Sequence, residues 1–444
     1  MVIAGTYLPQ GPTETSVDRA SHVVEYWPES GQWKDIAVLR QPLTETLPVA
    51  GKPGAFVAVD GEERRRFERG PDGTWREVAQ SALEEGGGRQ ASDERQRGVW
   101  RLRVDEALNR PPDIVAVGPS GESVRLTRLN PQFSAEDWGT MRAFGWKDAK
   151  DRQWNGGLMV PAGFDPAVKH ALVVQTYGFA PERFYRDGTN TFDGATGGFP
   201  GRAFLRENIL VLAMPTRAAT GEPEDLHERT NAFIDGVRAA IDALVAQGSV
   251  DRDRIGIIGW SATGAQTLNL VTFTDTPIRA ASMVDSDSNT LFSMTITYSV
   301  LDGIQLKKER LNEGGPFGAT LNRLIRNDPS LHTDCIRAAL RFEAYGSHVH
   351  NNWDIYALLR RQYRPVEMIV FPEGAHALSR PSERMISLQG NVDWHRFWLK
   401  EERRSELELP NETAAALAGQ YVRWAQMADM KRHVDRMPAC VRDE

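Results

Sequence analysis

The chain has 444 residues, of which 41% are hydrophobic and 25% charged, and its formal net charge at pH 7 is −7. This length is sufficient for two or three domains of ordinary globular composition. The negative charge disfavours a general nucleic-acid-binding surface, so we expect no nucleic-acid partner. The two cysteines, Cys335 and Cys440, make no disulfide framework.

Targeting signals are absent from the sequence as written. No apolar run approaches the length that a membrane span needs. The N-terminus, Met1 to Thr6, has neither a basic segment nor a long apolar segment, so no signal peptide is visible. Taken literally, these features predict a cytoplasmic protein.

Residues 1–140 are predicted to form a β-rich region. Short β-prone runs alternate with turn signals such as Asp60-Gly61 and Pro119-Ser120-Gly121. Such spacing fits one or two propeller blades or a small sandwich. The strand candidates are residues 21–27, 54–59, 99–104 and 123–127, and residues 83–98 read as a solvated loop.

From Met141 the pattern changes to alternating strands and helices. This alternation predicts an α/β domain over residues 141–405, with a mostly parallel sheet that helices cover on both faces. A further helix over 413–434, within a C-terminal region at 406–444, is expected to dock on its surface. Predicted strands are 156–161, 171–178, 208–215, 254–258, 279–284, 340–345 and 366–371, and predicted helices are 226–247, 265–273, 353–363 and 392–399.

The run Gly259-Trp260-Ser261-Ala262-Thr263-Gly264 carries the strongest chemical signal. It lies between a β-branched strand and a helix, which is the context of a nucleophile elbow. A strained turn there exposes a serine hydroxyl above a helix N-terminus, where negative charge is favoured. The usual motif is G-x-S-x-G, but here Thr263 holds the second glycine position. We predict Ser261 as the nucleophile; the alternative is an ordinary strand–helix turn.

A serine nucleophile needs a base, and His376 is the candidate. It follows the last predicted sheet strand, in Phe371-Pro372-Glu373-Gly374-Ala375-His376. The chain order serine, acid, histidine is that of α/β-hydrolases, in which this loop reaches the serine.

The acid of the predicted triad has more than one candidate. We expect it just past the strand that ends near Tyr345, where Asp354 is the first carboxylate. Asp354 also suits the first turn of a helix, where it complements the helix dipole. Glu343 is a second candidate, inside the strand, and the acid could also be absent. His348 and His350 suggest a metal site, but no third ligand is evident, so no metal is predicted.

An oxyanion hole requires a second donor beside the backbone N–H of Ala262. Tyr177 stands at the end of a predicted strand, and a neutral tyrosine hydroxyl can donate a hydrogen bond. The alternative for Tyr177 is a core aromatic side chain.

These motifs resemble the prolyl-oligopeptidase family of serine peptidases. The resemblance rests on Gly259-Trp260-Ser261, on Thr176-Tyr177-Gly178 at a strand end, and on His376 after a Phe-Pro-x-Gly turn. In that family a tyrosine at the matching strand end supplies the oxyanion hydroxyl, which the resemblance assigns to Tyr177.

The subgroup of lasso-peptide isopeptidases is more similar still. The elbow of this chain, Trp260-Ser261-Ala262-Thr263-Gly264, looks like the elbow of that subgroup, including the threonine. Three further segments are similar to this subgroup: Leu129 to Phe133, Arg364 to Glu367 and Asn391 to Lys400. The resemblance covers about residues 100–430.

Two departures from this family are visible. Its members carry a full propeller before the hydrolase domain, whereas this chain has room for one or two blades. One expectation is therefore that a stretch before Met1 is missing, and a signal peptide lost with it would make the protein periplasmic. In addition, the position where the isopeptidases place their acid falls at His348.

The sequence thus predicts an α/β-hydrolase-fold serine hydrolase that cleaves peptide or isopeptide amides through an acyl-enzyme, without a cofactor. Ser261, His376 and Asp354 would be the triad, with Tyr177 and Ala262 as oxyanion donors. The alternatives are a carboxylesterase, which uses the same chemistry, and a catalytically impaired hydrolase fold that binds peptides.

Overall fold

A computed structural model describes much of the chain, and it divides into two compact units, Met1–Val99 and Trp100–Glu444. Each unit is considered by itself. The described residues are 2–7, 21–27, 30, 32–39, 43–49, 52, 54–60, 63–78, 100–133, 138–185, 198–297, 312–315, 317–404, 411–436 and 440. The predicted loop at 83–98 lies outside them.

The first unit is built of antiparallel strands, as predicted. Phe56 and Phe67 face each other across adjacent strands, their rings stack at 5.2 Å, and they form a small core with Val23 and Ala58. One sheet holds β1 (Val2–Tyr7), β2 (Ser21–Trp27) and β3 (Gln32–Leu39). The other holds β4 (Leu43–Pro48), β5 (Ala55–Asp60), β6 (Glu63–Arg69) and β7 (Trp75–Val78).

The second unit begins with a small antiparallel sheet in the order β10-β9-β8. The turn between its first two strands is hydrogen-bonded to a later strand, residues 140–147. The Asn109 side chain donates to the Met141 carbonyl at 2.7 Å and accepts from the Met141 N–H at 2.6 Å. Its strands are β8 (Arg101–Ala107), β9 (Arg110–Val117) and β10 (Ser123–Arg125).

An eight-stranded sheet forms the centre of the second unit, in the order β11-β12-β14-β13-β15-β16-β17-β18. β11 and β12 are antiparallel to their neighbours, whereas the six strands β13 to β18 are parallel to one another. The parallel strands end at one edge, so loops after different strands meet there. The strands are β11 (Thr140–Lys147), β12 (Gln153–Val160), β13 (His170–Thr176), β14 (Ile209–Met214), β15 (Val250–Trp260), β16 (Ile278–Val284), β17 (Ala339–Tyr345) and β18 (Val366–Phe371).

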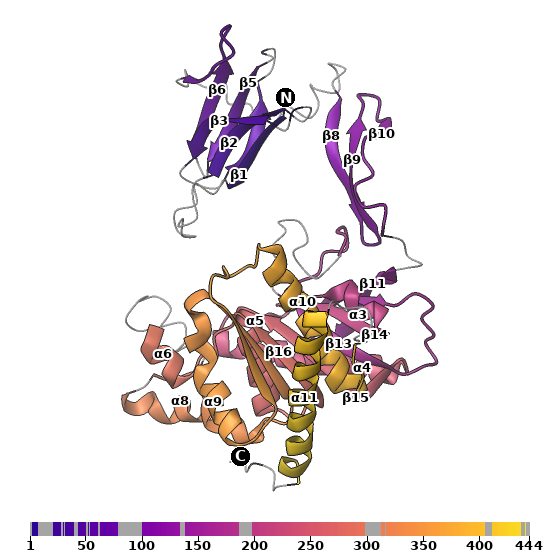
Figure 1. Cartoon of the computed structure of the whole chain (residues 1–444), viewed down its shortest axis with the longest axis vertical. Helices are drawn as coiled ribbons and strands as arrows, with labels where there is room; N and C mark the ends of the chain where they lie inside the picture. The colour runs from indigo at the N-terminus through magenta and orange to yellow at the C-terminus, as the bar shows by residue number, and fades with distance from the viewer. Residues whose placement is uncertain are drawn as a thin grey trace. The chain divides into compact units, whose positions relative to one another are not determined.

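Helices cover both faces of this sheet, as the alternating pattern predicted (Figure 1). Successive strand residues point to opposite faces, so Leu172 packs in one core and Val173 in the other. The core containing Leu172 includes α4 (Leu226–Ala246), α5 (Ala262–Phe273) and α9 (Trp353–Arg361). The core containing Val173 includes α3 (Gly201–Arg206), α10 (Pro381–Lys400) and α11 (Asn411–Val434).

The last helix, α11, docks by an aromatic contact. Trp424 is fully buried, its ring lies 5.3 Å from that of Trp394 in α10, and its indole N–H donates to Glu367 at 2.8 Å. Short helical segments complete the fold: α6 (Leu291–Thr297), η2 (Gly318–Thr320), α8 (Leu321–Asn327), η3 (Pro329–Cys335) and η4 (Gly346–Asn352). Among the described residues, no helix has the length and apolarity that crossing a bilayer needs.

The two cysteines form one covalent link, which the sequence analysis did not anticipate. Cys335, at the end of η3, is bonded to Cys440, which follows α11, over a sequence separation of 105 residues. Closing so long a loop removes much conformational freedom from the unfolded chain. The link therefore holds Cys440, which follows α11, to the end of η3 through a covalent bond.

We expect the double variant Cys335→Ser/Cys440→Ser to lose about 2–4 kcal/mol of unfolding free energy. Urea denaturation of the oxidised wild type and of the variant measures this difference. Each single variant should match the double variant, since either one removes the bond. An unchanged urea midpoint would show that the bond contributes nothing to stability.

Candidate active site

Ser261 occupies a strained turn between β15 and α5. Its backbone has φ 55° and ψ −126°, outside the regions that side chains favour, as expected for a nucleophile elbow. The flanking glycines permit this turn. A Cβ on Gly259 would lie 2.4 Å from the Thr263 carbonyl oxygen, and one on Gly264 would lie 2.4 Å from the Ser286 Cβ.

Thr263, at the second glycine position of the usual motif, ties this turn together. Its hydroxyl is buried, donates to the Trp260 carbonyl at 2.8 Å and accepts from the Trp260 N–H at 3.0 Å. It also lies 2.7 Å from the Thr176 hydroxyl at the end of β13. The departure from the motif therefore adds hydrogen bonds that fix the elbow to the neighbouring strand.

His376 lies beside Ser261, in the loop after β18. Its Nε2 is 3.0 Å from the Ser261 Oγ, which is within hydrogen-bonding distance. Trp260 holds the imidazole in place: the two rings stack at 4.7 Å, and the indole N–H donates to the His376 carbonyl at 3.0 Å. The structure thus brings together two residues that are 115 positions apart in the sequence.

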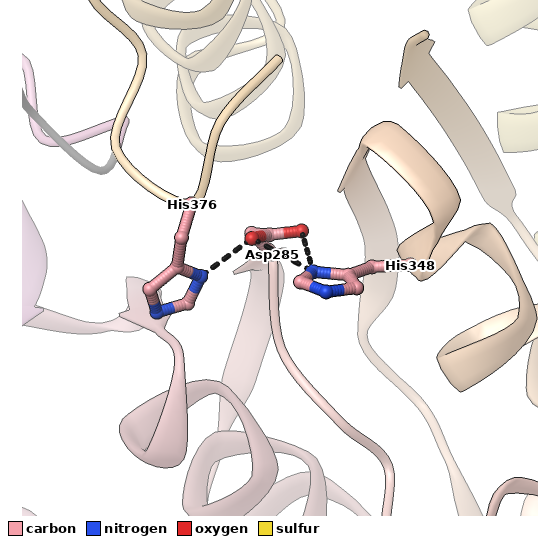
Figure 2. Close-up of side chains that lie close together, drawn as sticks. All are labelled: Asp285, His348 and His376. Atoms are coloured by element: carbon pink, nitrogen blue, oxygen red, sulfur yellow. Dashed lines mark hydrogen bonds and ion pairs between the residues drawn. The ribbon is translucent and has the colours of Figure 1, made fainter. Parts of the chain in front are cut away.

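The carboxylate that contacts His376 belongs to Asp285, immediately after β16. Its Oδ2 is 2.6 Å from the His376 Nδ1, a distance typical of a charge-assisted hydrogen bond. Its Oδ1 accepts from the Tyr345 N–H at 2.9 Å, and its side chain is fully buried. Figure 2 shows the Asp285 carboxylate between the imidazoles of His376 and His348.

His348 is the second imidazole on this carboxylate. It comes from η4, just past β17, and its Nδ1 is 3.1 Å from each carboxylate oxygen of Asp285. Burial alone would raise the pKa of Asp285, but hydrogen bonds from His348 and His376 outweigh it, so this pKa is lowered. The hydrogen bond to Asp285 in turn raises the pKa of His348. Asp285 is therefore ionised at neutral pH.

Neither acid named in the sequence analysis contacts His376 among the described residues. Asp354 lies in the first turn of α9, where burial, together with the charge of Asp328, raises its pKa to about 6. That environment disfavours the ionised form that a triad acid needs.

Glu343 is fully buried inside β17, where its carboxylate has other partners. It accepts hydrogen bonds from Ser387, from Asn391 at 2.8 Å and from Arg341 at 3.3 Å. Arg341 also pairs with Glu367 of β18. This network joins two sheet strands to α10 and engages Glu343 away from His376.

The sequence analysis did not consider Asp285, although one signal was available. Asp285 directly follows the apolar strand that neighbours the elbow strand in the sheet. Parallel strands end at a common edge, so a carboxylate after β16 can reach the loop that carries His376. The sequence analysis placed the acid just past the strand that ends near Tyr345, which is the next strand of the sheet after β16.

Tyr177 and Ala262 lie at the same edge as Ser261. Tyr177 follows β13 with a φ of 120°, a conformation rare outside glycine, and its N–H is held by the Met214 carbonyl at 3.1 Å. Its ring lies 4.7 Å from that of Trp260, and Ala262 begins helix α5. Strain of this kind is concentrated at functional sites.

A pocket of about 520 Å³ opens over these residues. It is lined by Tyr177, Ser261, Ala262 and His376, as well as by His348. A volume of this size accommodates several residues of a peptide or a ligand of similar size. The lining also includes polar and charged side chains of both signs, among them Arg217, Glu222, Arg229 and Asn269.

Comparison with known proteins finds similarity both to curated sequences and to many solved structures. No family model matches the chain. The lasso peptide isopeptidase AtxE2 of Asticcacaulis excentricus is 23% identical over 342 residues, which cover 74% of this chain and 46% of that protein. The chain thus spans about half the length of the curated relative it matches.

Solved structures agree with this similarity. AtxE2 isopeptidase with Astexin3-dC4 bound has a TM-score of 0.59 and 14% identity, over 97% of this chain and 64% of that one. Acylaminoacyl peptidase of Pyrococcus horikoshii has a TM-score of 0.55 and 17% identity, over 91% and 62%. These comparisons confirm the α/β-hydrolase fold and the resemblance to prolyl-oligopeptidase-type peptidases and lasso peptide isopeptidases that the motifs predicted.

Proposed function

We propose that this protein is a serine hydrolase that cleaves peptide or isopeptide amide bonds through an acyl-enzyme. The observation that carries the proposal is the continuous line of contacts from Ser261 Oγ through the His376 imidazole to Asp285. This arrangement of nucleophile, base and orienting acid recurs on unrelated folds, so it is identified by geometry and not by sequence position.

In the proposed acylation step, Ser261 Oγ attacks the carbonyl carbon of the scissile amide. His376 Nε2 accepts the hydroxyl proton and then gives it to the leaving amine. Asp285 keeps the proton of the neutral imidazole on Nδ1, leaving the Nε2 lone pair free to accept. Its buried negative charge also stabilises the imidazolium that forms.

Negative charge develops on the carbonyl oxygen in the tetrahedral intermediate. We assign its stabilisation to the backbone N–H of Ala262, at the N-terminus of α5, and to the hydroxyl of Tyr177, both of which line the same pocket as Ser261. One such donor contributes about 3–4 kcal/mol in enzymes where it has been removed. Water then attacks the acyl-enzyme, with His376 acting as base again.

The substrate class is proposed from the relatives. AtxE2 is named a lasso peptide isopeptidase, and one of its structures holds Astexin3-dC4. The pocket that Ser261 lines supports a peptide substrate, because polar residues among its lining can hydrogen-bond a peptide backbone. A carboxylesterase shares the triad, so the ratio of amide to ester turnover separates the two activities.

We expect Ser261→Ala to abolish hydrolysis and Asp285→Asn to lower kcat by on the order of 10⁴-fold, because the asparagine favours the wrong imidazole tautomer. Peptide p-nitroanilide and p-nitrophenyl ester turnover, together with labelling by a fluorophosphonate probe, measures these effects. Full turnover by Ser261→Ala would exclude Ser261 as the nucleophile. A wild-type protein that the probe does not label would favour the peptide-binding alternative.

The matched control for the acid is Asp354→Asn, which we expect to keep wild-type kcat. This variant also tests the raised pKa of Asp354. Because the folded state favours the protonated form, ionisation of Asp354 lowers stability progressively as pH rises from about 4 through 6.

Asp354→Asn removes that cost, so its stability advantage over wild type should grow by about 1 kcal/mol between pH 5 and pH 8. Urea denaturation at the two pH values measures it. An advantage that shrinks with rising pH would contradict the burial argument. A large loss of kcat would restore Asp354 as the acid.

A further inference from the structure

We propose that Asp285, His348 and His376 together bind a divalent transition-metal ion such as Zn²⁺, and that the bound ion switches the hydrolase off. Binding is independent of the hydrolytic mechanism, whereas inhibition rests on the function proposed above. The three residues come from separate elements: the loop after β16, η4, and the loop after β18. Figure 2 shows the two imidazoles converging on one carboxylate.

The donor atoms are already close to a coordination geometry. One possible ligand atom from each residue lies within 4.8 Å of the others. Within the described part of the chain, these residues form the group of His, Cys, Asp or Glu side chains that is close enough to share a metal ion. Two imidazoles and a carboxylate are a ligand set that zinc accepts, at about 2.0–2.2 Å, which places neighbouring donors about 3.3 Å apart in a tetrahedral site.

The His348–Asp285 contact is 3.1 Å and the His376–Asp285 contact is 2.6 Å. Both contacts must therefore lengthen by less than 1 Å to admit the ion.

The site is accessible, and its imidazoles have room to adjust. The side chains of His348 and His376 are 46% and 47% exposed, whereas that of Asp285 is fully buried. The carboxylate is thus a fixed anchor, and the imidazoles can rotate outward. The pocket above them can supply a water molecule as the fourth ligand. Asp287, whose charge acts on His348, adds negative potential that favours a cation.

In the proposed hydrolytic mechanism, His348 neither contacts the serine nor transfers a proton. One imidazole suffices as base, and the second only shares the carboxylate that orients the first. It occupies the position at which the related isopeptidases are expected to carry their acid. A histidine there, with its Nδ1 directed at the carboxylate, supplies the donor that a conventional triad lacks.

Occupation by a metal is incompatible with the base function of His376. In the triad, the Nδ1 proton is donated to Asp285 and Nε2 accepts from Ser261. A metal ion bound at Nδ1 needs the lone pair of that nitrogen, so Nδ1 cannot keep its proton. The proton of the neutral imidazole must then be on Nε2. An Nε2–H cannot accept the serine proton. A protonated His348 would release its proton to solvent on binding, and His376 keeps one proton throughout.

Binding is tested on the Ser261→Ala protein without a polyhistidine tag, by zinc calorimetry and by the visible absorption of Co²⁺. We expect one ion per chain and the spectrum of a tetrahedral cobalt site. Ser261→Ala/His348→Asn and Ser261→Ala/His348→Gln should each bind at least about tenfold more weakly. The matched control Ser261→Ala/His350→Asn changes a neighbouring histidine of η4 and should bind as Ser261→Ala does. Thermal melts verify that each variant is folded.

Inhibition is tested with the wild-type sequence at Ser261. Zinc should abolish hydrolysis at concentrations that saturate the calorimetric site, and EDTA should restore it. His348→Asn should need at least about tenfold more zinc for half inhibition, relative to its own metal-free rate. Equal zinc binding by the folded His348 variants and the His350 control would overturn the site. Binding without inhibition would overturn the switch, and a protein that binds zinc but never hydrolyses would refute only the proposed function.

Discussion

The hydrogen bond between Asp285 and His376 is the interaction on which the whole site depends. It joins a loop after β16 to a loop after β18, two strands that are separated in the sheet by β17. An ionised carboxylate without solvent contact is costly unless hydrogen bonds compensate for its lost hydration. Here the Tyr345 N–H and two imidazoles provide them. The same bonds that stabilise the charge therefore also orient the imidazole that we propose as the base.

The position of the acid follows from what surrounds the next strand. In β17, Glu343 is committed to a buried network with Arg341, Ser387 and Asn391, which holds α10 against the sheet. The turn after β17 carries His348 in place of a carboxylate. Among the described residues, the carboxylate seen to hydrogen-bond His376 is that of Asp285, directly after β16. Asp285 has a φ of 42°, so the chain turns sharply as it leaves the strand.

The sequence was most informative where hydrophobic periodicity was strong. The predicted helix at 226–247 corresponds to α4 at Leu226–Ala246, and the strand at 366–371 matches β18. The prediction for 392–399 captured less than half of α10, which starts at Pro381, because its first turns are polar and partly exposed. β6 was missed because four arginines give it no apolar run, although Phe67 faces the core.

Site residues that belong to a short sequence motif could be predicted, whereas the residue whose position depends on the order of strands in the sheet could not. The elbow around Ser261 and the loop of His376 could be recognised because each is a short motif beside a strand. The partner of His376 is fixed by which strand ends beside which loop, and that depends on sheet order and not on sequence distance. Asp285 precedes His376 by 91 positions, and no short motif in the sequence links the two residues.

The arrangement of two imidazoles on one carboxylate sets a limit on what this site can do at once. His376 can offer its Nε2 lone pair to Ser261 only while its proton stays on Nδ1, hydrogen-bonded to Asp285, and His348 contacts the same two carboxylate oxygens. Any ligand that needs the Nδ1 lone pair would therefore disable the proposed base, His376, without contacting the proposed nucleophile, Ser261. Because both histidines are about half exposed and line the same pocket as Ser261, a peptide and a cation would approach from the same side. A bound peptide that covers this wall would exclude the ion, so substrate and metal should compete for the site even though they contact different atoms.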